Sequence, residues 1–167
     1  KNSIQAAKKH ENSTLDFKLK DMRKSFDIKY DAVFNLFTSF GYFENDIDDI
    51  LVLKNIHNGL NENGLLVLDF LNVINVKKKL VKKEIKIIDN ITFNLEREIK
   101  DGFIIKHINF KDKGVNHSYY ERVKYLDLVK FKSYFIEAGL KINHIFGDYH
   151  LTKFNPVTSE RLIFVVS

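Results

Sequence analysis

Two short segments of the sequence carry residues that could bind a flat ring bearing an amine. Asp21 and Met22 follow a stretch in which apolar and charged residues alternate. A carboxylate there can accept a hydrogen bond from an exocyclic amine, and a thioether can pack on the ring. The second segment, 35–39 (NLFTS), follows an apolar run and offers backbone carbonyls and small polar groups. Since open α/β sheets bind ligands at the carboxyl ends of their strands, we expect both segments at one rim of a sheet.

The apolar pattern around these segments predicts an α/β fold. Residues 32–37 and 65–71 are nearly continuous apolar runs, typical of strands buried on both faces. A helix is expected over 46–60, because apolar residues recur there at spacings of three and four. A strand, a helix and a second buried strand make a right-handed parallel crossover unit, with Asn63-Gly64 as the turn into the second strand.

Acidic residues crowd the start of the expected helix, at Asp46, Asp48 and Asp49 after Asn45. They can cap free backbone N–H groups and complement the helix dipole. A cation site is the alternative, although one helical turn of carboxylates more often serves as a cap.

The remaining core elements lie towards both ends of the chain. A helix ends within 3–10, and the alternating residues 15–20 suit a strand near a sheet edge. A helix is expected over 127–138, with Gly139 as its stop, before two final strands at 141–146 and 161–166.

Between these halves, residues 84–125 have the pattern of an antiparallel meander. Four short β-prone runs (85–88, 91–95, 103–110 and 118–124) are separated by Asp89-Asn90, Asp101-Gly102 and Lys113-Gly114. We therefore predict three segments: an α/β core segment over 1–83, the inserted meander over 84–125, and the rest of the core over 126–167.

At this point the sequence resembles a known family, the Rossmann-like (class I) S-adenosylmethionine-dependent methyltransferases. The resemblance rests on Asp21 at a strand end, on 30–33 (YDAV) and on 63–72 (NGLLVLDFLN). The segments 35–43 (NLFTSFGYF), 121–123 (ERV) and 137–140 (EAGL) are similar to a bacterial subgroup that methylates small molecules. The resemblance implies a mostly parallel sheet flanked by helices, S-adenosylmethionine as cofactor and a small-molecule acceptor.

The resemblance also implies roles for single residues. Asp21 would bond the adenine amine and Met22 would pack on the ring, while Asn35, Leu36 and Phe37 would line the methionine end of the cofactor. Substrate contacts would come from Ser39, Tyr42, Phe43, Arg122 and Tyr149. If the meander covers the substrate, Phe103, Tyr119 and Tyr120 could join them; a plain extension of the core sheet is the alternative.

The family's glycine-rich loop and the acidic residue that ends its second strand have no counterpart here, since none of the seven glycines forms GxGxG. By this resemblance the first strands of the sheet are missing, and the strand at 32–37 would expose an unpaired apolar edge. The isolated chain is therefore expected to bind cofactor poorly and to be inactive alone. A homodimer could form through that edge or through the meander.

No catalytic base stands out. Tyr149 and His150 are weak candidates because they follow the penultimate strand, while His107, His117 and His144 lack any supporting motif. Methyl transfer from a sulfonium depends mainly on positioning and on exclusion of water, so a base is needed only for an acceptor that must lose a proton.

Composition and motifs limit the kinds of site, location and partner that the sequence allows. The sequence has no cysteine, no metal-ligand pair of histidines and no apolar run near the roughly 20 residues of a membrane helix. We expect a cytoplasmic protein without metal, membrane or nucleic-acid partner, and interpret 77–83 (KKKLVKK) as a solvated connection. The main alternative to an enzyme is a non-catalytic methyltransferase-like interaction module. A nucleic-acid methyltransferase is suggested only by the net charge of +5.

Overall fold

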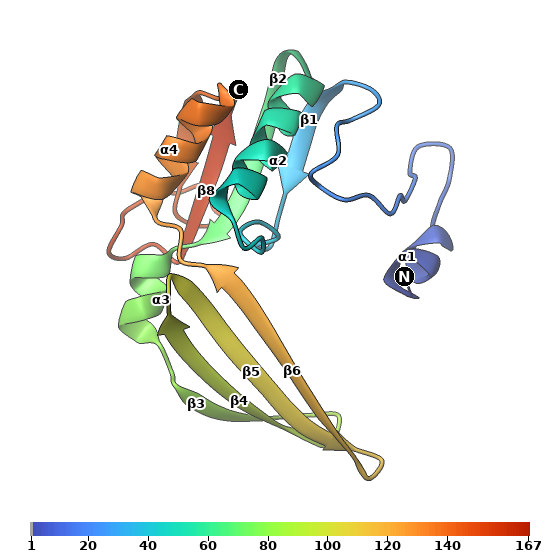
Figure 1. The fold of residues 1–167 in the computed structure, drawn as a ribbon, viewed down its shortest axis with the longest axis vertical. Helices are drawn as coiled ribbons and strands as arrows, with labels where there is room; N and C mark the ends of the chain where they lie inside the picture. Colours follow the sequence, from blue (N-terminus) through green and yellow to red (C-terminus); the bar gives the residue numbers. More distant parts are fainter. Residues whose placement is uncertain (1) are drawn as a thin grey trace.

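The computed structural model describes residues 2–167 and places eight strands of that part in two separate sheets (Figure 1). The core sheet has the order β1-β2-β8-β7. Its strands are β1 (Tyr30–Asn35), β2 (Leu60–Leu71), β7 (Ile142–Phe146) and β8 (Arg161–Val166). β1 is parallel to β2, and β8 is antiparallel to both β2 and β7. Three strands therefore run in one direction and β8 in the other, so the α/β fold is confirmed, with one parallel pair and two antiparallel pairs in this sheet.

Two helices, α2 (Asp46–Gly59) and α4 (Leu128–Ala138), pack side by side against the core sheet (Figure 1). Phe131 of α4 is fully buried, with its ring 5.1 Å from Phe70 of β2 and 5.0 Å from Phe164 of β8. α4 ends as expected, because Gly139 adopts a left-handed backbone with φ 79°.

The expected strand at 15–20 is wrong. Residues 9–29 contain no helix or named strand, and the isolated bridge Asn12–Leu15 is the nearest approach to pairing. Leu19 is 70% exposed. An alternating pattern forms a strand only when another strand lies beside it, and none does so within residues 2–167. The helix end before it is present as α1 (Asn2–Lys8).

β1 lies at the edge of the core sheet, and in the described part of the chain it pairs with β2 alone. Phe34 of β1 is 63% exposed, so this strand is not buried on both faces as its apolar run predicted. β2 is buried on both faces over most of its second half, because it lies between β1 and β8.

The second sheet is the predicted meander, with the order β3-β4-β5-β6 and antiparallel pairing throughout. Its strands are β3 (Lys83–Ile88), β4 (Ile91–Lys100), β5 (Phe103–Asp112) and β6 (Val115–Lys124). It extends from the core as a single curved layer after the short helix α3 (Val73–Lys79) (Figure 1). Because its strands form a sheet of their own, the alternative of a core-sheet extension is wrong.

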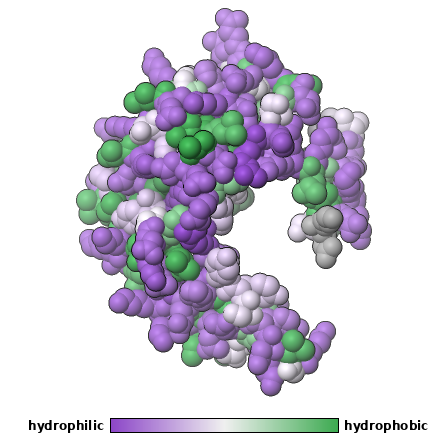
Figure 2. Space-filling model, in the orientation of Figure 1, coloured by the Kyte–Doolittle hydropathy of each residue, from purple (hydrophilic) through white to green (hydrophobic). Residues whose placement is uncertain are grey.

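The overall outline is open. The N-terminal segment, the core and the meander enclose a wide gap on one side of the molecule (Figure 2). Within residues 2–167, no helix combines the length and apolar character needed to cross a bilayer.

Candidate active site

The segments around Met22 and Asn35 meet at the carboxyl end of β1. Asn35, the last residue of the strand, is buried, and its Nδ2 lies 3.9 Å from Met22 Sδ. Asn35 Oδ1 is buried as well and has no hydrogen-bond partner among the described residues. A buried amide oxygen without a partner is uncommon in proteins, and it suits a site that a ligand completes. The two expected segments therefore share one rim of the sheet.

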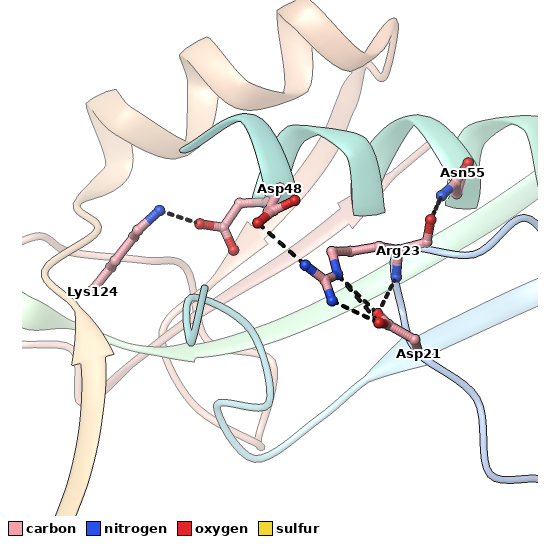
Figure 3. Close-up of polar contacts among 6 residues, drawn as sticks. Asp21, Arg23, Asp48, Asn55 and Lys124 are labelled. Carbon is pink, nitrogen blue, oxygen red and sulfur yellow. Dashed lines mark hydrogen bonds and ion pairs between the residues drawn. The ribbon is translucent and has the colours of Figure 1, made fainter. Parts of the chain in front are cut away.

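Asp21 is held beside this rim by Arg23 (Figure 3). Arg23 Nη2 donates to Asp21 Oδ2 at 2.8 Å, while its Nη1 reaches Asp48 of α2 at 3.5 Å. Asn55 of α2 fixes the same turn by donating to the Arg23 carbonyl at 2.8 Å. The hydrogen bonds from Arg23 lower the pKa of Asp21 to about 2. Asp21 is thus an ionised acceptor with remaining lone pairs, in the state that an exocyclic amine requires.

The turn after β1 is tied to Asp69 of β2. Phe37 N donates to Asp69 Oδ2 at 2.9 Å, and Thr38 N donates to the Asp69 carbonyl at 3.1 Å. Phe37 and Thr38 both have a left-handed backbone, with φ 57° and 60°, which is uncommon for residues other than glycine. The turn leaves the Phe37 ring 77% exposed at the rim.

Asp69 also binds two side chains from the end of the chain. Tyr149 donates its hydroxyl to Asp69 Oδ2 at 2.9 Å, and Arg161 Nε donates to Oδ1 at 2.8 Å. Arg161 further donates from Nη2 to Thr38 Oγ1 at 3.1 Å. We call these four residues, Thr38, Asp69, Tyr149 and Arg161, the Asp69 cluster. Because Asp69 is 1% exposed, one buried carboxylate of β2 joins the turn after β1, the loop after β7 and the start of β8.

Solved structures share this arrangement of strands and helices, although no protein-family model and no curated protein matches the sequence. An S-adenosylmethionine-dependent methyltransferase from Clostridium acetobutylicum has a TM-score of 0.78 over 99% of this chain and 68% of its own, at 17% identity. The CcbJ methyltransferase from Streptomyces caelestis has a TM-score of 0.76 over 89% and 61%, at 16% identity. The amino pentose methyltransferase CalS10 from Micromonospora echinaspora, solved with S-adenosylmethionine bound, has a TM-score of 0.61 over 88% and 62%, at 16% identity.

The chain has the class I methyltransferase fold. It spans 61 to 68% of the length of these three neighbours. In this fold the rim formed by Met22, Asn35 and Phe37 lies at the carboxyl end of a parallel strand, where open α/β sheets bind their ligands.

Of the other residues expected near the site, some are exposed and others contact the surrounding protein. Ser39 turns back on its own loop, donating from Oγ to the Leu36 carbonyl at 2.6 Å. Tyr42 is 52% exposed, and partial burial raises the pKa of its hydroxyl, so it stays protonated near neutral pH. Phe43 is half-buried, with the Arg23 guanidinium 4.9 Å from its ring centroid. Leu36 is likewise half-buried.

Arg122 is engaged within the protein. Both of its terminal nitrogens bond the carboxylate of Glu44, and its guanidinium lies 3.3 Å from the ring centroid of Phe103. Glu44 precedes α2, whereas Arg122 and Phe103 belong to the meander. The substrate contact expected of Arg122 would require it to leave Glu44, and in this structure Arg122 joins the meander to the core.

At the acidic start of α2, the N-cap residue Asn45 makes no side-chain hydrogen bond to the helix. Instead, Lys124 bonds Asp49 at 2.6 Å and Asp46 at 2.9 Å, and Lys130 reaches Asp46 at 2.7 Å. Within residues 2–167, no group of three metal-ligating side chains is gathered. The carboxylates therefore join α2 to the meander and to α4.

Neither weak catalytic candidate is placed as a base. The loss of water around the Tyr149 hydroxyl, together with its hydrogen bond to Asp69, raises the pKa of Tyr149. Its proton is directed to Asp69, so Tyr149 is poorly suited to remove a proton from an acceptor. His150 follows on the same exposed loop, where its backbone N–H donates to Asp148 at 2.9 Å.

Sequence reasoning missed Asp69 and Arg161. Asp69 lies 80 positions before Tyr149 and 92 positions before Arg161, so no local motif joins these residues. The available signal was a single carboxylate inside the apolar run of β2, since a buried charge is expected to have a partner.

Proposed function

We propose that the chain is part of an S-adenosylmethionine-dependent methyltransferase that acts on a small-molecule acceptor. The observation that carries this proposal is the contact between Asn35 and Met22 beside an ionised Asp21, at the carboxyl end of β1 in a class I fold. CcbJ and CalS10 are named as methyltransferases, and CalS10 was solved with this cofactor. A cytoplasmic location and the absence of nucleic-acid partners remain predictions.

The residues at the rim fit the expected cofactor. Asp21 can accept from an adenine amine, Met22 is 38% exposed and can pack on the ring, and the unpartnered Asn35 Oδ1 can accept from the amino-acid end. When bound, the cofactor supplies an activated methyl group, which moves to an acceptor lone pair as its bond to sulfur breaks. The exposed Phe37 and Tyr149 would hold the acceptor at the same rim and exclude water from it.

The meander would complete the substrate side or form a dimer. Its aromatic face carries Phe93, Phe110, His117 and Tyr119. The Phe110 ring centroid lies 4.7 Å from that of Phe93 and 4.8 Å from that of His117. Tyr119 is 57% exposed. An accessible apolar face on a single-layer sheet is typical of a surface that covers a ligand or meets another protein.

Calorimetric titration of the full chain, as its gene encodes it, tests the cofactor site. We expect S-adenosylhomocysteine to bind, and Met22→Ala and Asn35→Ala each to weaken binding by about three- to tenfold, as loss of one contact of about 1 kcal/mol implies. Asn109→Ala in the meander is the matched control and should leave binding unchanged. Equal binding by all four proteins, or none by the wild type, would contradict the proposal.

One observation favours the alternative of a non-catalytic interaction module. β1 pairs on one side only within residues 2–167, so its free edge could bind a strand of another protein instead. Formation of S-adenosylhomocysteine from S-adenosylmethionine with a panel of small amines and alcohols distinguishes the two, because the module would produce none.

A further inference from the structure

The Asp69 cluster determines how the Tyr149 hydroxyl is oriented. A carboxylate paired with Arg161 offers only acceptor atoms, so Tyr149 must donate its proton to Asp69 Oδ2. The lone pairs of the phenolic oxygen are then left for another donor. Tyr149 is 60% exposed overall, so an external molecule can reach its side chain.

The same carboxylate oxygen positions Phe37. Phe37 N and Tyr149 Oη each lie 2.9 Å from Asp69 Oδ2, so two exposed aromatic residues are held by one buried carboxylate oxygen. Arg161 supports the pair, because it bonds Asp69 and Thr38 and lies 5.8 Å from the Tyr149 ring centroid. Removing Asp69 would therefore release both the Phe37 turn and the hydroxyl.

We propose that Asp69 is a positioning residue and that the Tyr149 oxygen it orients selects acceptors carrying an N–H or O–H group. The inference rests on the proposed methyl transfer and names its substrate class: an amine or alcohol with an apolar body that packs on Phe37. When the N–H or O–H group of the methyl acceptor donates to the Tyr149 oxygen, the lone pair of the reacting atom points away from that oxygen. Methyl acceptors without a hydrogen on the reacting atom would offer no donor to the Tyr149 oxygen and would bind more weakly.

Two cations of the same charge test this selection. Benzylamine carries N–H donors, whereas benzyltrimethylammonium has the same ring and charge but no donor. Binding to the full chain is followed by NMR of protein containing tyrosine labelled with ¹³C at Cζ, with the Tyr149 signal assigned through its loss in Tyr149→Phe. We expect benzylamine to shift this signal and to bind roughly tenfold more tightly than the quaternary ion, as one charge-assisted hydrogen bond implies.

Single-residue variants distinguish a loss of the binding preference from a failure to fold. Tyr149→Phe changes an exposed side chain and should abolish the tenfold preference. Asp69→Asn should reduce the preference and move the titration of Tyr149 to lower pH, a change that a purely structural role would not produce. Tyr30→Phe, at the opposite end of β1 from the rim and 38% exposed, should keep the preference. If Asp69→Asn fails to fold, Tyr149→Phe alone decides the selection.

The outcomes also distinguish this inference from methyl transfer itself. Equal affinity for the two ions, no detectable binding of benzylamine, or a preference retained in Tyr149→Phe would each overturn the inference, even in a protein that binds S-adenosylhomocysteine. Conversely, the preference for benzylamine is measured without cofactor. If it is present in a protein that binds no S-adenosylhomocysteine, the hydrogen bond to Tyr149 is supported and the methyltransferase proposal is rejected.

Discussion

Lys124 Nζ lies 2.6 Å from Asp49 Oδ2, and both residues are buried, with exposures of 5% and 0%. Lys124 is the last residue of β6, whereas Asp49 belongs to the first turn of α2. The ion pair therefore joins the meander to the core at the point where the chain returns from one sheet to the other. The Lys124 backbone strengthens this junction by donating to the Gly41 carbonyl at 2.8 Å.

Replacing Lys124 with Met should lower the free energy of unfolding by about 3–5 kcal/mol, because Asp49 would stay buried without a counter-charge. Urea unfolding followed by circular dichroism measures the change. Lys130→Met is the matched control: Lys130 is half-exposed in its pair with Asp46, so its loss should cost less than about 1 kcal/mol. Adding Asp49→Leu to Lys124→Met should restore much of the stability, and no recovery would contradict this account.

Asp46 should make the stability of the protein depend on acid pH. Lys130 and Lys124 hold the pKa of Asp46 below its usual value, so its folded form binds a proton less readily than the unfolded chain. That stabilisation is complete above the unfolded pKa of about 4 and is lost as the pH falls towards the lower folded pKa. Asp49 makes the opposite contribution to the pH dependence of stability, because burial raises its pKa.

The contribution of Asp46 is isolated by comparing wild type with Asp46→Asn in urea at pH 6 and at pH 2.5. We expect the stability difference to shrink at the lower pH, by a modest amount because the Asp46 side chain is 44% exposed and screened by solvent. Asp27→Asn is the control, since its carboxylate is 89% exposed. A difference that is the same at both pH values would show that the ion pairs of Asp46 contribute nothing.

Gly41 and Gly102 should differ in their tolerance of a methyl group although both have positive φ, 81° and 78°. A Cβ at Gly41 would lie 3.3 Å from Leu126 Cδ1 and 3.5 Å from Phe70, whereas nothing lies within 4 Å at Gly102. Gly102→Ala should cost about 1 kcal/mol from backbone strain alone, and Gly41→Ala should cost more because packed side chains must also move. Urea midpoints of the two variants check this order, and equal losses would contradict it.

The fold was largely predictable where a periodic residue pattern and the strands or helices that it packs against lie close together in the chain. The four meander strands and α4 followed from alternation, Gly-containing turns and the helical spacing before Gly139. Residues 15–20 had an equally clear alternation yet form no strand, because a pattern does not reveal whether a neighbour exists.

The candidate site was predictable in part for the same reason. Met22 and Asn35 were expected at one rim and lie in contact. Asp69 could not be assigned, since its partners Phe37, Tyr149 and Arg161 come from three separate segments. Arg122 was expected to face a ligand, but its partner Glu44 lies 78 positions away and is not signalled by any motif.

The edge of β1 provides the last prediction, a homodimer that Phe34→Lys disrupts. Phe34 is 63% exposed on a strand that pairs on one side within residues 2–167, and an unpaired apolar edge tends to associate with another chain. Sedimentation velocity should show association that weakens when a lysine is placed on this edge. Ile136→Lys on α4 is the matched control, because Ile136 is 78% exposed but lies on a helix. If Tyr119→Lys dissociates the protein and Phe34→Lys does not, the meander face is the interface; a wild-type monomer at all concentrations would show that the homodimer prediction is wrong.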